Sequence, residues 1–223
     1  MLIFGLKIMK TMRIIGLLLV LWMPFRLSAQ TMKDVFLAMP DTLLPTLTAN
    51  DRADFVDFLD SHMRAQVKNR LGQSSELLAL TADYLLLQTS AAATMQLKLL
   101  PLTDSTRVVC CVHTYAGPAA DSQLMFYTPQ WQPLPSDGLF EPPVPADYLL
   151  PPDSLALLPQ SDALHAADLP LFRFDLDASA PTLRVTYTTP DYLDPSTADD
   201  LRRCLRCGTL AYVWRGGRFV REE

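Results

Sequence analysis

The sequence predicts an α+β protein in which N-terminal helices pack on an antiparallel sheet and a second antiparallel, strand-rich unit follows. Apolar residues recur at helical spacing through much of residues 32–71, which indicates helices. From residue 80 onward, short apolar and β-branched runs alternate with Gly, Pro and small polar clusters, a pattern typical of strands. Nine of the eighteen prolines lie within residues 129–160 and divide the strand-rich part in two. We therefore expect one unit at 30–128, a proline-rich connector at 129–160 and a second unit at 161–223.

Residues 1–29 have the layout of a secretory signal peptide. Basic side chains come first, an apolar run follows at 14–22, and Leu27-Ser28-Ala29 offers a cleavage site before Gln30. The apolar run is shorter than the roughly 20 residues that a membrane-spanning helix needs, so an uncleaved membrane anchor is the less favoured alternative. We expect an exported protein, periplasmic or extracellular, that is not inserted in the membrane after the signal is removed.

The charge of the chain excludes two classes of partner. The predicted signal holds four of the 19 Lys and Arg residues and no acid, so the rest of the chain has 15 basic and 24 acidic side chains and a net charge of −9. Nucleic-acid binding needs clustered Lys and Arg to neutralise phosphates, and docking on an anionic membrane surface has the same requirement. We therefore expect neither nucleic acid nor an anionic membrane as a partner.

Two helices are expected before the first predicted strand. Residues 32–36 have helical spacing, and a longer helix is predicted from Asp51 to Leu71, with Thr48 or Asn50 as its N-cap and Gly72 as its stop. Its apolar stripe consists of Val56, Leu59, Met63 and Val67. Every third residue from 51 to 60 is an aspartate. We interpret these four carboxylates as a solvated face, because side chains that drift around a helix do not converge on a metal ion.

Eight strands are predicted, four in each unit. The first unit has runs at 84–88, 94–100, 107–113 and 123–127, whose short links favour an antiparallel meander packed on the preceding helix. The second unit has runs at 171–176, 182–188, 210–214 and 218–221. Gly216 and Gly217 predict a hairpin between the last two runs, and residues 196–205 predict a short helix capped by Ser196 or Thr197. Similar apolar strings in the two units leave an internal duplication open.

Four cysteines remain after the predicted signal. Cys110 and Cys111 are adjacent in a strand-like run, so they are expected to point to opposite faces of a sheet. Cys204 and Cys207 form a Cys-x-x-Cys motif near the end of a predicted helix, whereas redox dithiols lie at a helix start, where the backbone amides lower the thiol pKa. We favour a structural disulfide or buried thiols at this pair. A redox site, and a metal site shared with the other two cysteines, are the alternatives.

No convergent set of catalytic residues can be assigned. The candidate bases are His62, His113 and His165, which fall on a predicted helix, a strand and a loop. The chain has no Gly-x-Ser-x-Gly elbow, no His-Glu-x-x-His motif and no phosphate-cradling glycine loop. We therefore predict no catalytic residue, no cofactor-binding residue, no metal ligand and no cofactor, although a site built from distant residues remains an alternative.

Aromatic side chains on the predicted strands and the connector have two interpretations. Trp131, Trp214 and Tyr127 are expected in the core, as most strand aromatics are. The alternative is an exposed face that recognises a glycan or a protein.

Four segments carry a resemblance to a known family. They are Phe36–Pro45, Arg52–Phe58, Leu97–Pro101 and Asp121–Tyr127, with Trp131 after the last. In this order they resemble an exported family of unknown function from Bacteroidales, domain of unknown function 3256. The resemblance implies an envelope protein of a Gram-negative anaerobe, and it implies no catalytic residue.

Two functions follow as hypotheses of different classes. The first is a non-catalytic periplasmic or secreted binding module for an unknown protein or glycan. The second is a hydrolase that acts on an envelope or dietary polymer through an unrecognised site. A cleft in which a histidine contacts Ser or Asp would favour the hydrolase.

Overall fold

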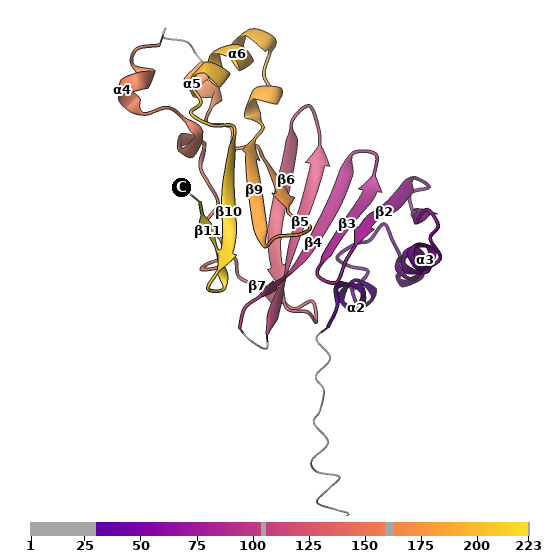
Figure 1. The fold of residues 1–223 in the computed structure, drawn as a ribbon. Helices are drawn as coiled ribbons and strands as arrows, with labels where there is room; N and C mark the ends of the chain where they lie inside the picture. Colours follow the sequence, from indigo (N-terminus) through magenta and orange to yellow (C-terminus); the bar gives the residue numbers. More distant parts are fainter. Residues whose placement is uncertain (1–29, 104–105, 159–162, 223) are drawn as a thin grey trace, which may run out of the picture.

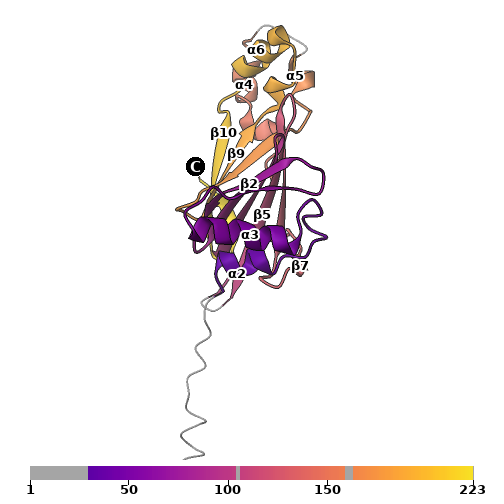
Figure 2. The same cartoon turned by 90° about the vertical axis from the view of Figure 1, so that its right-hand side faces the viewer.

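The computed structural model describes residues 30–103, 106–158 and 163–222. It has three layers, as Figure 1 shows. Helices α2 (Met32–Leu37) and α3 (Ala49–Asp60) cover one face of a seven-stranded antiparallel sheet, and a four-stranded antiparallel sheet packs on the other face. The quarter-turned view of Figure 2 shows the two helices lying side by side in front of the large sheet. The predicted mixture of helices and antiparallel sheets is confirmed.

The large sheet runs in chain order from β1 to β7. Its strands are β1 (Gln66–Lys68), β2 (Ser74–Leu80), β3 (Tyr84–Ser90), β4 (Ala93–Pro101), β5 (Arg107–Ala116), β6 (Ala120–Tyr127) and β7 (Pro133–Leu134). The four predicted strands correspond to β3 through β6. Sequence reasoning missed β1, β2 and β7. Two of these have only two or three residues, and β2 lacks a clean alternation because its register shifts between Leu77 and Ala79.

The small sheet has the order β11-β10-β9-β8. Its strands are β8 (Phe172–Leu176), β9 (Thr182–Tyr187), β10 (Thr209–Arg215) and β11 (Arg218–Arg221), which correspond to the four predicted runs. Gly216 and Gly217 both have positive φ, 58° and 79°, the geometry that a two-residue hairpin loop requires. Both sheets are meanders, but their strand numbers differ, and an internal duplication stays a prediction.

Helix α3 ends at Asp60, eleven residues before the predicted end at Leu71. His62 adopts the left-handed region at φ 56°, and the Met63 N–H donates to the Phe58 oxygen at 2.8 Å. This is the hydrogen bond of a Schellman termination. The chain then reverses into β1, so Val67 lies on a strand and Met63 is half exposed. Only Val56 and Leu59 of the predicted stripe lie on the helix, and Val67 packs against the same core cluster from strand β1.

Capping residues fix the starts of the helices. Thr48 is the N-cap of α3, which confirms one of the two residues predicted for this position. Asp51 completes a reciprocal capping box with it. Asp60, another member of the aspartate series, pairs with Lys33 at 2.8 Å. Helix α6 (Pro195–Arg203) is capped by Asp194, which corrects the predicted Ser196 or Thr197. Short helices complete the fold: η1 (Pro145–Tyr148), α4 (Pro152–Leu155), α5 (Ala163–Ala166) and η2 (Thr189–Asp191).

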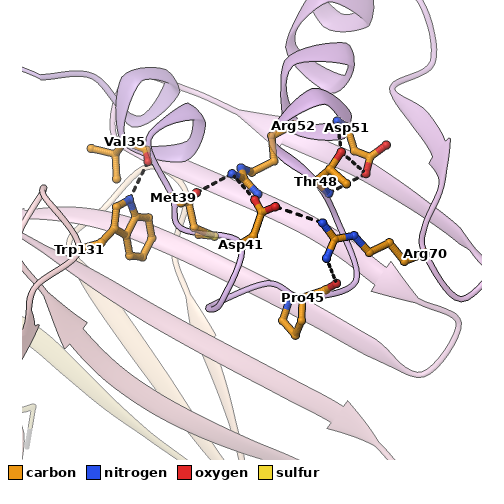
Figure 3. A network of polar contacts seen from close by, with 9 residues as sticks. All are labelled: Val35, Met39, Asp41, Pro45, Thr48, Asp51, Arg52, Arg70 and Trp131. Carbon is orange, nitrogen blue, oxygen red and sulfur yellow. Dashed lines mark hydrogen bonds and ion pairs between the residues drawn. The ribbon is translucent and has the colours of Figure 1, made fainter.

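A buried arginine holds the loop between α2 and α3, as Figure 3 shows. Arg52 is 2% exposed, and its Nη2 donates to the Met39 oxygen at 2.5 Å and to Asp41 Oδ1 at 3.0 Å. Arg70 donates to the other oxygen of Asp41 at 3.2 Å and to the Pro45 oxygen at 3.2 Å. Within the described residues, Nε and Nη1 of Arg52 have no partner. This network ties the loop to the turn that precedes β2.

The core lies on both faces of the large sheet. Cys111 belongs to the apolar cluster under the helices, and Cys110 belongs to the cluster between the two sheets, which confirms that they point to opposite faces. Phe140 and Tyr148 of the proline-rich connector are buried in the inter-sheet cluster. This cluster therefore contains side chains from both predicted units and from the connector between them.

The β8 edge of the small sheet is covered by side chains of the large sheet. The N–H groups of Phe172, Phe174 and Leu176 donate to Asp121 Oδ1, Ser122 Oγ and Gln96 Oε1 at 3.2, 3.0 and 2.8 Å. Three successive outward-facing donors of an edge strand are thus satisfied within the chain. No helix among the described residues is long and apolar enough to cross a membrane.

Candidate binding pocket

A cavity of about 660 Å³ opens beside β11, at the edge of the small sheet opposite β8. One wall consists of β11 with Tyr212 of β10, and the other wall is the connector segment 137–147. The lining residues are Asp137, Gly138, Leu139, Phe140, Glu141, Pro142, Pro143, Asp147, Tyr212, Arg218, Phe219, Val220 and Arg221.

Phe140 anchors one end of the connector wall. Its ring contacts Phe174, Tyr212 and Phe219 edge-on, with centroids 5.9, 5.3 and 6.0 Å away, a favourable geometry for aromatic pairs. Next to it, the Leu139 oxygen accepts the Phe219 N–H at 2.8 Å. These contacts explain why a proline-rich segment is ordered here, since its large apolar side chains supply the core contacts that a free linker lacks.

Asp147 anchors the other end of the connector wall. One carboxylate oxygen accepts the Val144 N–H at 2.9 Å and the other pairs with Arg221 at 2.9 Å. The Val144 hydrogen bond and the Arg221 guanidinium lower the pKa of Asp147, so this carboxylate is ionised at neutral pH. The next residue, Tyr148, is fully buried and donates to the Val185 oxygen at 2.9 Å. The connector therefore passes β11 as an anchored segment, fixed at 139–140 and at 147–148.

The pocket contains charges of both signs. Asp147 and Arg221 are the charged lining residues that form an ion pair within the described part of the chain. Asp137, Glu141 and Arg218 are exposed and belong to none of the ion pairs of the described residues. Burial raises the pKa of Tyr212, so its phenol stays protonated. The arrangement offers hydrogen bonds and charge pairing, and the described residues that line it include no histidine, cysteine or serine.

The three candidate bases are not brought together. His62 is exposed at the left-handed position after α3, His113 is half-buried on β5, and His165 lies on α5. Burial lowers the pKa of His113, which keeps its imidazole neutral at pH 7. In the described ranges none of the three has a hydrogen bond to Ser or Asp, and no group of three or more His, Cys, Asp or Glu side chains suits a metal ion.

The three candidate recognition aromatics are buried. Trp131, Trp214 and Tyr127 are 5, 5 and 7% exposed. The Trp131 indole donates to the Val35 oxygen at 2.9 Å, as drawn in Figure 3, and the Trp214 indole donates to the Pro101 oxygen at 2.6 Å. Each indole satisfies its one donor inside the protein, and the three residues leave little surface for a ligand to contact.

The Cys-x-x-Cys motif lies at the C-terminal end of a helix, where the sequence places it. Cys204 is the C-cap of α6, and its thiol donates to the Asp200 oxygen at 3.3 Å. Burial and the nearby Asp200 raise the pKa of Cys204, which disfavours the thiolate that redox chemistry needs. Both thiols are free in the structure, and the disulfide stays a prediction. Burial raises the pKa of Cys111 to about 12 and that of Cys110 as well.

Sequence reasoning did not find the pocket. Its residues come from 137–147 and from 212–221, and neither segment contains a motif with a known ligand. The sequence indicates that the connector is ordered, because large apolar residues such as Phe140 lie between its prolines. It does not reveal which strand the connector lies beside.

Two comparisons with known proteins each cover most of the chain. A family model described as "Protein of unknown function (DUF3256)" matches residues 25–219. A solved structure, a domain of an uncharacterized protein from Porphyromonas gingivalis W83, is similar with a TM-score of 0.74 and 28% sequence identity, over 85% of this chain and 96% of that chain. No curated protein matches. On the match to residues 25–219, the chain belongs to the family described as protein of unknown function (DUF3256).

Proposed function

We propose that this chain is an exported, non-catalytic binding module whose ligand occupies the cavity between β11 and the connector. The observation that carries the proposal is the make-up of this cavity: about 660 Å³, walled by a strand edge and an anchored segment, with exposed charges of both signs. Ligand sites are concave and have few, placed polar groups. A cavity of this size is within the usual range for such sites, about 300–1,000 Å³.

Export rests on the sequence of residues 1–29, which lie outside the described residues. Thr31 caps α2 by accepting the Asp34 N–H. A capped helix directly after the predicted cleavage site is compatible with a mature protein that starts at Gln30. Periplasmic and extracellular locations both agree with this proposal.

The rival function, hydrolysis of an envelope or dietary polymer, has less support. A hydrolase needs an acid or base within hydrogen-bond reach of a nucleophile or a water in a cleft. Among the described residues that line the cavity, the ionisable groups are the carboxylates of Asp137, Glu141 and Asp147, two arginines and the phenol of Tyr212. No observation on the described residues couples two of the carboxylates to each other.

Position-specific photocrosslinking tests the proposed site. A benzoyl-phenylalanine is introduced at Val220, which lines the cavity and is 38% exposed, and in a control protein at Leu78 on β2, which is 50% exposed. Strands β2 and β11 lie on opposite sides of the molecule (Figure 1). Each protein is irradiated with envelope material from the native host. We expect adducts from position 220 and not from position 78. Equal adduct yields at both positions, or none at 220, would contradict a binding site in this cavity.

A further inference from the structure

We infer that the ligand is an extended peptide segment that adds to the outer edge of β11 and presents a basic side chain to the connector wall. This inference rests on the proposed binding function and specifies its ligand. A peptide that extends a sheet gains affinity from main-chain hydrogen bonds, while alternate side chains enter pockets on either side.

The two edges of the small sheet differ in how they are protected. At β8, three successive N–H groups donate to side chains of the large sheet, so this edge has no room for another strand. At β11, the connector covers only the beginning of the edge, where the Phe219 N–H donates to Leu139. The rest of the edge, from Val220 to Arg221, lines the cavity. An exposed strand edge is a template for another chain, and here the cavity leaves space for one.

The backbone groups that face the cavity follow from the strand period. The Phe219 N–H points away from β10, because its partner is Leu139 of the connector. Along a strand, outward-facing and inward-facing backbone groups alternate. The N–H and C=O of Arg221 therefore point to the same outer edge as those of Phe219, whereas Val220 pairs with Val213 of β10. A peptide strand placed in the cavity meets this pair of groups at Arg221.

The opposite wall favours a one-sided strand. Pro142 and Pro143 line it, and proline has no N–H to donate. At these two positions a peptide would find no backbone donor, whereas Arg221 of β11 offers both an N–H and a C=O. The unpaired carboxylates of the connector wall, Asp137 and Glu141, lie where a Lys or Arg side chain of that peptide would be stabilised.

The test uses a labelled probe peptide, acetyl-Thr-Lys-Val-Lys-Thr-Val-amide, and fluorescence anisotropy with the mature chain. The matched control peptide has the same side chains, but alternate backbone nitrogens are methylated. It therefore lacks the N–H groups that would donate to β11. We expect saturable binding of the probe and about tenfold weaker binding of the methylated peptide, the fold-change for loss of one or two hydrogen bonds. Equal binding of the two peptides would overturn the strand-addition inference.

Two protein variants separate the backbone contribution from the side-chain contribution. Arg221→Ala removes the guanidinium but keeps the N–H, whereas Arg221→Pro also removes the N–H at an edge position that tolerates proline. We expect Arg221→Pro to bind the probe about tenfold more weakly than Arg221→Ala. Equal affinities would overturn the proposed main-chain bond, once circular dichroism shows that both variants are folded.

Charge reversal tests the connector wall. Glu141→Lys is expected to weaken binding of the lysine probe several-fold and Glu141→Gln to weaken it less, with the order reversed for a probe that has Glu in place of Lys. If neither probe binds while crosslinks from position 220 persist, the peptide inference fails and the binding function stands. If those crosslinks are absent as well, both fail together.

Discussion

Replacing Trp131 by Phe tests whether this residue is a structural anchor for α2 or a recognition residue. The indole N–H donates to the Val35 oxygen at 2.9 Å. Helix α2 ends at Leu37, and the Met39 N–H donates to Phe36 instead of Val35. The Val35 oxygen is therefore one of the C-terminal carbonyls that a helix leaves without an internal partner, and Trp131 supplies that partner.

The cost of Trp131→Phe is set by the carbonyl that it leaves unpaired. Trp131 is 5% exposed and its ring contacts that of Tyr127 in a tilted arrangement, with centroids 5.4 Å apart, and Phe retains most of that packing. An unsatisfied buried acceptor costs about 1–3 kcal/mol. For a chain of this length we expect the unfolding midpoint to fall by roughly 2–12 °C.

Thermal unfolding by circular dichroism measures the midpoint, and amide hydrogen exchange locates the effect. Amides of α2 should exchange faster in the variant, while those of β8 to β11 should keep their protection. An unchanged midpoint with unchanged α2 exchange would refute the anchoring role. If stability were unchanged but ligand binding were lost, Trp131 would be a recognition residue instead.

Three further predictions concern stability. His62→Gly should raise the free energy of unfolding by about 1 kcal/mol in denaturant titrations, because glycine adopts the left-handed conformation at this helix end without the side-chain penalty; a loss of stability would contradict the Schellman termination. Asp41→Ala should lower the free energy of unfolding by about 1–3 kcal/mol, less than the loss of a fully buried ion pair because Asp41 is 41% exposed. Adding Arg52→Met should recover much of that loss. No recovery would mean that the unpaired charge of Arg52 is not the cause. Replacing both Cys204 and Cys207 by Ser should leave the circular dichroism spectrum and the binding of the probe peptide unchanged, and loss of binding would assign the motif a functional role.

The sequence predicted those parts of the fold that depend on local patterns. Thr48 was identifiable as a helix cap because the acids follow it at the right spacing, and Gly216-Gly217 indicated its hairpin because two adjacent left-handed residues suit that turn. The end of α3 was missed because His62 adopts a conformation that non-glycine residues seldom adopt. A helical apolar pattern continued past it into Met63 and Val67.

The pocket could not be predicted for a different reason. It exists because the Leu139 oxygen bonds to Phe219, a residue 80 positions away, and because Asp147 pairs with Arg221. Such contacts depend on how the connector crosses the small sheet, which no local pattern encodes. Trp131, Trp214 and Tyr127 illustrate the same limit: the core was the favoured interpretation, but the local pattern alone is compatible with a buried and an exposed face alike.

The central claim is that the cavity between β11 and the connector is the ligand site. Hydrogen exchange of the mature protein, measured with and without envelope material of the native host, tests it without assuming the nature of the ligand. The account predicts slower exchange confined to backbone amides of 137–147 and 218–222. Slower exchange at α2 and α3 or at α6, with none at these two segments, would contradict it.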